Sequence, residues 1–347
     1  MGWRGVCYNE LCRRSGAVTE QWTRNRTSGI IMGMLEAEVA EGAMRVRISG
    51  WIVAGVAGAL LLAEGVCRWG MGLGEPQLSV ADAELDYRFV PGQSGVYRGC
   101  RYAYNRASMR SDREIMEVPL LPGRRRVIVA GDSIVNGEAR TDQDDLATSL
   151  LDGVDGMEVY NLSACSWGPL NVLAYFRRYG TLGATDVVFV FSDHDLWDDD
   201  PALAAGEKVG LSADFQARKP FCALWEWGRF YLYPQVRCAL GRPLSPPPLK
   251  PQGNIEVRNL EACAALFRLP IARKAVVFHR TQREWAQGKT TYGEQQLRRC
   301  AMQAGVPFAL LEAVPEADYR DNIHLNVRGQ RKLAALIGQM LSVRDVK

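Results

Sequence analysis

The chain has 347 residues, of which 47% are hydrophobic and 23% are charged, and its formal net charge is +3. This length suits one large domain with additional segments, and neither the charge nor any basic run interleaved with aromatic residues indicates a nucleic-acid partner. The nine cysteines include no CxxC pair and no metal-ligand spacing, so neither a metal nor a cofactor is predicted.

Residues 1–47 are polar, contain several arginines and show no clear periodicity, which predicts a cytoplasmic tail without regular structure. An alternative is that translation starts at Met44, because basic residues followed at once by an apolar run are how a membrane signal opens. Residues 48–67 are predicted to be a transmembrane anchor, since about 20 mostly apolar residues at 1.5 Å each span a bilayer core of roughly 30 Å. A buried globular helix is the alternative for this segment.

Arg45 and Arg47 precede the apolar segment, whereas Glu75, Asp82 and Glu84 follow it soon after. The positive-inside rule then keeps the N-terminus in the cytoplasm and sends the bulk of the chain across the membrane. No small-x-small cleavage site follows the apolar run cleanly, so the anchor is predicted to stay uncleaved. The sequence therefore predicts a single-pass protein of the cell membrane with an extracytoplasmic domain.

Residues 68–123 are interpreted as a connector that contains glycines and prolines. Within it, residues 97–105 alternate enough to form a strand or a hairpin ahead of the main sheet. Their arginine and tyrosine side chains could bind an acidic or glycan ligand, although a solvated edge strand is the simpler interpretation.

A buried strand is predicted at 127–130, where four apolar residues are followed by Gly131. An apolar run without alternation is typical of a strand buried on both faces of a parallel sheet. Gly131 permits a sharp turn, and Gly137 allows the next segment to pack close to the sheet. Ser133 would therefore lie just past the carboxyl end of the strand, where open α/β sheets bind their ligands. By itself, the sequence Gly-Asp-Ser also consists of residues that are common in ordinary turns.

Strands and helices alternate after Ser133, which indicates βαβ crossovers and an α/β domain with a parallel sheet. Asp144 and Asp145 are predicted to cap a helix that runs to Leu151. Further strands are predicted at 157–162, 186–191, 275–278 and 307–311, and further helices at 169–178, 262–267, 295–304 and 330–341.

Residues 196–252 interrupt this alternation after the third strand. Residues 221–240 are rich in Trp, Phe and Tyr, and residues 242–252 are rich in proline. An insertion at this position would sit over the crevice at the carboxyl ends of the strands, so a lid or an acyl-chain groove is one interpretation. An aromatic helix packed on the flank of the domain and a face resting on a bilayer are the alternatives.

The last predicted strand is followed by Asp321 and His324. An Asp and a His three residues apart can share one turn, in which the carboxylate orients the imidazole. Serine is a poor nucleophile at its own pKa and needs such an oriented base within hydrogen-bond reach. The sequence therefore predicts that Ser133, His324 and Asp321 act together in catalysis. A helix N-terminal acid beside a surface histidine is the alternative.

These residues resemble two sequence blocks of the SGNH (GDSL-type) hydrolases. The block Gly-Asp-Ser-x-x-x-Gly is matched by Gly131 to Gly137, and the block Asp-x-x-His is matched by Asp321 and His324; the resemblance covers residues 124–342. It implies a flavodoxin-like three-layer α/β/α domain at 124–347, with a mostly five-stranded parallel sheet and ester chemistry through a covalent acyl-serine.

The resemblance also implies an oxyanion hole, in which the backbone N–H of Ser133 is one donor. The family spacing Asn-x-x-x-x-Gly, counted from Asn161, places Ser166 where the family has glycine, with Gly168 two residues further on. His194 stands where the family has the asparagine of Gly-x-Asn-Asp, so an imidazole would replace an amide donor. Removing one such donor costs on the order of 10²–10³ in kcat.

The three histidines all follow predicted strands at the same edge of the sheet. For His279, a contact with the substrate and a purely structural role both remain open. Two cysteine pairs, Cys222 with Cys238 and Cys263 with Cys300, could form disulfides outside the cytoplasm, with free buried thiols as the alternative.

The predicted function is that of a membrane-anchored serine ester hydrolase. Ser133 would attack an ester carbonyl, His324 would take its proton, and water would release the acid; a sugar hydroxyl in place of water would make the protein an O-acyltransferase. By analogy with the family, the expected substrate is an acylated glycan outside the cytoplasm. The alternatives are a lipase or thioesterase that uses the aromatic insertion for an acyl chain, and a glycan-binding module that has lost catalysis.

Overall fold

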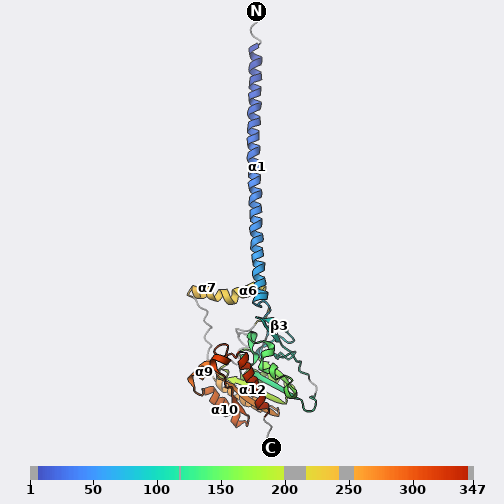
Figure 1. Ribbon diagram of the computed structural model, residues 1–347, viewed down its shortest axis with the longest axis vertical. Coiled ribbons are helices and arrows are strands. Elements are labelled where there is room, and N and C mark those ends of the chain that lie inside the picture. Colours follow the sequence, from blue (N-terminus) through green and yellow to red (C-terminus); the bar gives the residue numbers. More distant parts are fainter. Residues whose placement is uncertain (1–6, 117–118, 199–215, 242–253, 343–347) are drawn as a thin grey trace, which may run out of the picture. The chain divides into compact units, whose positions relative to one another are not determined.

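The computed structural model describes residues 7–116, 119–198, 216–241 and 254–342, and the chain divides into two compact units, Met1–Gly65 and Val66–Lys347 (Figure 1). In the first unit, one helix, α1, covers Cys7–Gly65. The prediction of a tail without regular structure over residues 1–47 is therefore wrong for its described part. The reason is that no proline occurs before Pro76 to stop a helix, and residues 34–47 are rich in strong helix formers.

The segment Met32–Gly70, which comprises the C-terminal part of α1 and the turn after it, is a candidate transmembrane span. Its mean hydropathy is 1.8 over 18 residues, and none of that window is buried. By length and composition this helix can cross a membrane, and the predicted anchor at 48–67 lies within it.

The second unit begins with a π-helical turn, η1 (Val66–Gly70), followed by two antiparallel hairpins. The hairpin of β1 (Ser79–Asp82) and β2 (Asp86–Phe89) was not predicted. The hairpin of β3 (Ser94–Tyr97) and β4 (Cys100–Ala103) confirms the one expected around 97–105.

A two-residue turn joins β3 to β4, and its residues Arg98 and Gly99 have φ of 53° and 78°. Positive φ at both residues is what a type I′ hairpin turn requires. Both hairpins also contribute to the main core, for example through Tyr87, Phe89 and Tyr102. The connector is thus packed into the same unit as the sheet.

A five-stranded parallel sheet forms the centre of the second unit, with the strand order β6-β5-β7-β8-β9. Its strands are β5 (Arg125–Gly131), β6 (Met157–Ser163), β7 (Asp186–Ser192), β8 (Arg273–His279) and β9 (Phe308–Leu310). All five lie where the sequence predicts strands. If these five strands are numbered 1 to 5 in chain order, their order across the sheet is 2-1-3-4-5, as in flavodoxin-like folds. The order reverses between β5 and β7, and open α/β sheets form their ligand crevice at this point.

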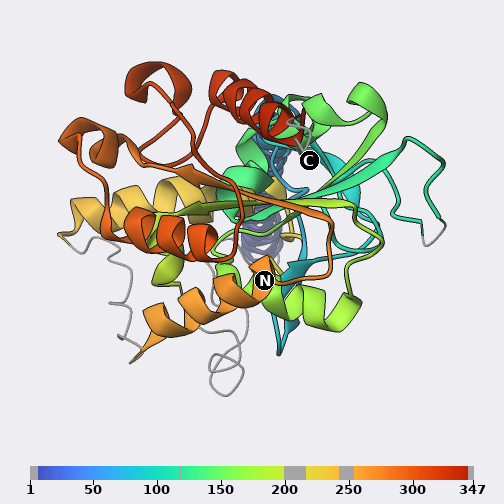
Figure 2. The same cartoon turned by 90° about the horizontal axis from the view of Figure 1, so that it is seen from below.

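Helices cover both faces of the sheet, which confirms the three-layer α/β/α architecture (Figure 2). One face carries α4 (Pro169–Tyr179), α8 (Ile255–Phe267) and α10 (Tyr292–Gln303); the other carries α2 (Ser133–Asn136), α3 (Ala147–Leu151) and α12 (Val327–Ser342). Along β5, Ile128 and Ala130 pack into the core on the side of α4, α8 and α10. Val127 and Val129 pack into the core on the side of α2, α3 and α12. Burial on both faces explains the unbroken apolar runs of the strands.

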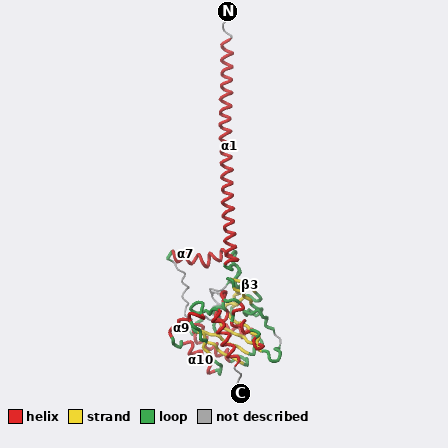
Figure 3. The backbone as a smooth tube through the Cα atoms, in the orientation of Figure 1, coloured by secondary structure: helices red, strands yellow, loops and turns green. Residues whose placement is uncertain are grey.

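Short elements lie between the main helices and strands, and Figure 3 distinguishes helices, strands and loops by colour. They are the 3₁₀ turns η2 (Glu138–Arg140), η3 (Gln143–Asp145), η4 (Val154–Gly156) and η5 (Asp193–Leu196), and the helices α9 (Gln282–Gln287) and α11 (Pro315–Asp318).

The helix predicted at 144–151 is shorter and capped differently. Asp144 and Asp145 lie inside η3, whose cap is Asp142 because its carboxylate accepts a hydrogen bond from the N–H of Asp144. The first N–H of α3 donates to Oε1 of Gln330 at 3.0 Å. A side chain of α12 thus takes the place of a local cap, which the local sequence does not reveal.

The described part of the insertion at 196–252 is helical over residues 223–239. It consists of α6 (Ala223–Trp227), the π-helical turn η6 (Gly228–Leu232) and α7 (Tyr233–Ala239). The proline-rich part, residues 242–252, lies outside the described residues. Cys222, Cys238, Cys263 and Cys300 are free thiols, so the described residues contain neither of the two conceivable disulfides.

Candidate active site

Ser133 lies at the start of α2, two residues past the end of β5. Glycine is required at residue 131, because a Cβ there would lie 2.7 Å from the carbonyl oxygen of Val190. Asp132 caps α2 by accepting a hydrogen bond from the N–H of Ile134 at 2.8 Å. The chain therefore turns sharply at the sheet edge and places the Ser133 hydroxyl where the strand order reverses.

Ser133, His324 and Asp321, which are far apart in the sequence, form one hydrogen-bonded chain. Nε2 of His324 lies 3.1 Å from Oγ of Ser133, and Nδ1 lies 2.9 Å from Oδ2 of Asp321. The carboxylate of Asp321 also accepts the backbone N–H groups of Ile323 and His324, at 3.0 Å and 2.8 Å. The structure thus brings the three predicted residues together in the order that the hypothesis requires.

Asp321 is held in its ionised form. Burial opposes its ionisation, but the two backbone N–H donors and the His324 side chain lower the pKa of Asp321 to about 2. An ionised carboxylate beside Nδ1 keeps a proton on Nδ1 and orients the ring, so that Nε2 faces Ser133.

Glu138 is a further charged group at the same imidazole, and sequence reasoning missed it. Its Oε1 lies 3.1 Å from Nε2 of His324, and its Oε2 lies 2.6 Å from Nη2 of Arg320. The residue adopts φ of 53°, an uncommon conformation for a side chain other than glycine. No local motif marks Glu138, because its partners come from a loop more than 180 residues away.

A buried arginine holds the loop that carries Glu138. The side chain of Arg110 is 1% exposed and donates to the carbonyl oxygens of Asn136, of Glu138 at 2.5 Å and of Thr141 at 2.8 Å. Its Nε also donates to Oε1 of Gln143 at 3.2 Å. The connector segment that precedes the sheet therefore fixes the backbone that follows Ser133.

The two loop donors predicted for an oxyanion hole differ in availability. Ser166 is exposed and has φ of 60°, the conformation that a glycine adopts readily, and a hydrogen bond from Trp167 N to the carbonyl of Ala164 closes its turn. By contrast, the N–H of Gly168 donates to Oδ1 of Asn171 at 3.0 Å. The prediction of Gly168 as an oxyanion donor is therefore wrong, because its N–H belongs to the N-terminal cap of α4.

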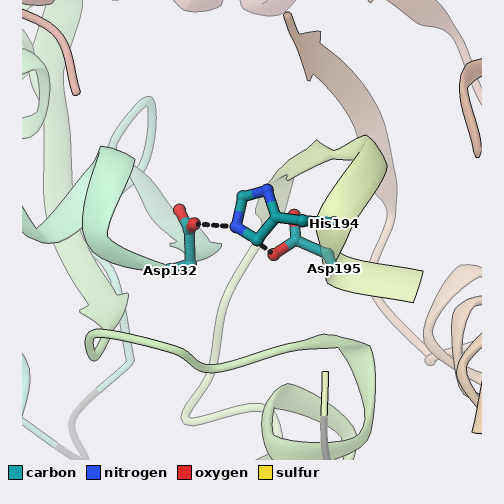
Figure 4. Close-up of side chains that lie close together, drawn as sticks. All are labelled: Asp132, His194 and Asp195. Carbon is teal, nitrogen blue, oxygen red and sulfur yellow. Dashed lines mark hydrogen bonds and ion pairs between the residues drawn. The ribbon is translucent and has the colours of Figure 1, made fainter. Parts of the chain in front are cut away.

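The side chain of His194 contacts two buried carboxyl groups (Figure 4). Its Nε2 lies 3.1 Å from Oδ2 of Asp132 and 3.5 Å from Oδ1 of Asp195. Burial would lower the pKa of His194, but the charge of Asp195 and the hydrogen bond to Asp132 raise it to about 11. Burial raises the pKa of Asp195, whereas the hydrogen bond to His194 and its charge lower the pKa of Asp132.

His194 is therefore an imidazolium next to the residue that precedes Ser133. Its Nε2–H is used by Asp132, so the prediction that His194 donates to an oxyanion now rests on Nδ1 alone. Nδ1 is buried and has no hydrogen-bond partner within the described ranges. Asp132, His194 and Asp195 each also offer one ligand atom within 4.8 Å of the others, as a metal site would. The contacts of His194 with Asp132 and Asp195 also account for this cluster as a network of charged side chains.

Replacing His194 with glutamine is expected to lower the melting temperature most near pH 6.5 and progressively less at higher pH. The pKa of about 11 in the folded protein lies above the value in the unfolded chain. The charge therefore stabilises the fold fully below about pH 6.5, and this contribution is lost as the pH rises towards 11. Melting curves of the full chain in detergent between pH 6.5 and 10 measure the difference. A difference that stays constant across this range contradicts the ion pair, and the exposed Asn322→Ala serves as the control.

His279 lies at the end of β8 and is completely buried. Its Nδ1 lies 3.3 Å from Oγ of Ser192, and its ring packs against Tyr319 with centroids 5.4 Å apart. Burial lowers the pKa of His279 to about 3, so the ring is neutral at physiological pH. The interpretation of His279 as a substrate contact is therefore wrong, and the structural role that the sequence left open is the one that the packing supports.

Comparisons with known proteins find no matching family model and no matching curated protein. Similar solved structures include an acetylxylan esterase from Geobacillus stearothermophilus, which is 12% identical with a TM-score of 0.36, over 64% of this chain and 96% of that chain. An aryl esterase from M. smegmatis is 18% identical with a TM-score of 0.33, over 63% and 100% of the two chains. A lipolytic protein of the G-D-S-L family from Desulfitobacterium hafniense is 8% identical with a TM-score of 0.33, over 62% and 99%.

Proposed function

We propose that the second unit is a serine ester hydrolase of the SGNH type that works through an acyl-serine intermediate. The observation that carries this proposal is the hydrogen-bonded chain of Asp321, His324 and Ser133, which gives the hydroxyl an oriented base 3.1 Å away. The position of Ser133 at the point where the strand order reverses supports it further, because open α/β sheets bind ligands there.

In this mechanism, Nε2 of His324 accepts the proton of Ser133 while Oγ bonds to the carbonyl carbon of the ester. The imidazolium then gives this proton to the leaving alcohol, and the acyl group stays on Ser133. A water molecule is deprotonated by His324 in the same way, attacks the acyl carbon and releases the acid. A sugar hydroxyl in place of water would transfer the acyl group instead.

The oxyanion would be stabilised by the N–H of Ser133, by the turn at Ser166 and by the imidazolium of His194. The φ of 60° at Ser166 supports its part, since this is a conformation that a glycine would adopt readily. The Nδ1 of His194, which has no hydrogen-bond partner among the described residues, supports its part, because a preorganised donor near developing negative charge lowers the barrier.

The proposed substrate is a short O-acyl ester on a glycan. A cavity of about 200 Å³ beside His324 is lined mainly by charged side chains (Arg98, Glu138, Arg140 and Asp321), which suit sugar hydroxyls better than hydrocarbon. An adjoining cavity of about 90 Å³, lined in part by Phe89, Cys165 and Phe230, has room for a short acyl group. The candidate span and the arginines before it support a single-pass protein with its N-terminus in the cytoplasm and this unit outside.

A lipase or thioesterase activity on long acyl chains is the second candidate, because aromatic side chains line the smaller cavity. The two candidates differ in chain-length preference. On 4-nitrophenyl esters, the proposed enzyme should cleave the acetate at least about tenfold faster than the octanoate, because even a single methylene that does not fit costs about that factor. The opposite order of rates would favour the second candidate.

A serine-directed fluorophosphonate tests the proposal on the full chain in detergent. We expect the wild type and Ser149→Ala, a control on α3, to be labelled, and Ser133→Ala to remain unlabelled. Labelling of Ser133→Ala would show that a residue other than Ser133 is the nucleophile. Absence of labelling in all three proteins would favour a glycan-binding module without catalysis.

A further inference from the structure

The helical segment at residues 223–239 exposes an apolar face. Trp225, Leu232, Val236 and Leu240 follow one another at spacings of seven, four and four residues, and their exposed fractions are 66%, 47%, 45% and 69%. Residues at such spacings lie on one side of a helix. Phe221, just before α6, is 97% exposed. Soluble surfaces rarely gather so many large apolar side chains without a partner.

The opposite side of this segment is bound to the start of the second unit. Glu226 is 3% exposed, and its Oε2 accepts the N–H of Gly74 at 2.7 Å while its Oε1 accepts the hydroxyl of Tyr97. Ala223 is fully buried on the same side, and α6 contacts η1. The apolar face therefore points away from the protein body because a buried carboxylate fixes the other side.

The attachment point connects this segment to the candidate span. The span ends at Gly70, and Glu226 binds only four residues later, at Gly74. Within η1, Val66 and Trp69 are 55% and 83% exposed. A chain that leaves a bilayer at Gly70 keeps α6 within a few residues of the lipid headgroups.

The composition of the segment fits that location. Tyr231 and Tyr233 are at least partly exposed, and tyrosine and tryptophan concentrate at membrane–water interfaces. Arg229 and Arg237 add positive charge, which anionic lipid headgroups attract. A lid over the site would need its apolar face turned inward, whereas Trp225 and Leu232 face outward.

We propose that residues 221–240 form an interfacial helix that lies on the bilayer surface from which the second unit emerges, with its apolar face among acyl chains and its arginines at anionic headgroups. This proposal rests on the membrane anchoring included in the proposed function. Phe230, on the inner side of the same helix, lines the cavity next to Glu138. The bilayer would thereby hold one wall of the candidate active site in place.

Photocrosslinking of the full chain in vesicles of phosphatidylcholine and phosphatidylglycerol tests this. The photoreactive residue p-benzoylphenylalanine replaces Leu232 or Val236; Met302, which is 72% exposed on α10, is the matched control, and Trp51 in the candidate span reports anchoring. We expect lipid adducts at 51, 232 and 236 that exceed those at 302 at least fivefold.

Adducts at 51 without adducts at 232 and 236 would overturn the interfacial helix and leave the anchor intact. Adducts at none of the positions would overturn both. Crosslinks from 232 or 236 to a second copy of the chain, in place of lipid, would assign the apolar face to a dimer contact and overturn the proposal as well.

Discussion

Replacing His324 with alanine is expected to lower kcat on an aryl acetate about 10⁴-fold, since loss of the base leaves Ser133 at its own weak nucleophilicity. Asp321→Asn should lower it by roughly 10³-fold, because the amide still accepts the backbone N–H groups of the turn but no longer stabilises the imidazolium. Initial rates on 4-nitrophenyl acetate measure both effects.

Asn322→Ala is the control for these variants, because its side chain is exposed in the same turn. Its rate should stay within a factor of about two of the wild type. Because the pKa of Asp321 is about 2, its carboxylate stays ionised in any practical assay. The contribution of this ionised carboxylate to the stability of the fold is lost only as the pH falls from about 4 towards 2. A kcat of His324→Ala within tenfold of the wild-type value would contradict the role of His324 as the base.

Replacing Arg110 with methionine is expected to destabilise the second unit by about 3–5 kcal/mol. The methionine fills similar space but leaves the buried carbonyl oxygens of Asn136 and Thr141 without a side-chain donor, and each such group costs about 1–3 kcal/mol. For a unit of this size, the loss corresponds to a melting temperature lower by roughly 10 °C. Arg110→Lys should recover only part of it, because an ammonium lacks the planar fork that reaches several carbonyls.

Arg113→Met is the matched control, since Arg113 lies three residues further on and forms an exposed ion pair with Asp152 at 2.9 Å. Exposed pairs contribute less than about 1 kcal/mol, so its melting temperature should change little. Equal effects of Arg110→Met and Arg113→Met would contradict the proposed anchoring of the loop. Thermal melting followed by circular dichroism separates the two outcomes.

Much of the fold could be predicted because its signals are local. The unbroken apolar run at 127–130 predicts a strand buried on both faces, and the structure has it in β5. The turn at Gly131 and the spacing of Asp321 and His324 are also local, and both meet at the sheet edge. The parallel sheet itself follows from the alternation of strands and helices.

Other features failed because they depend on partners that are distant in the sequence. From the sequence, the N–H of Gly168 was predicted to be a free donor, but in the structure it donates to Asn171 in the N-terminal cap of α4. The orientation of the His194 ring depends on Asp132 and Asp195, which are buried beside it. His279 follows its strand as the other histidines do, yet the packing of Tyr319 closes it off.

The sequence by itself determined the parallel sheet, the apolar segment long enough for a membrane, and the pairing of Ser133 with His324 and Asp321. Apolar periodicity and short motifs decide these, because they act over one strand, one helix or one turn. Only the tertiary structure decided that Glu138 contacts Nε2 of His324 and that Arg110 binds the backbone of the loop that carries Glu138. It also decided that the buried Glu226 leaves the apolar side of residues 223–239 exposed. Buried charges and hydrogen bonds find partners through space, and chain order does not record those distances.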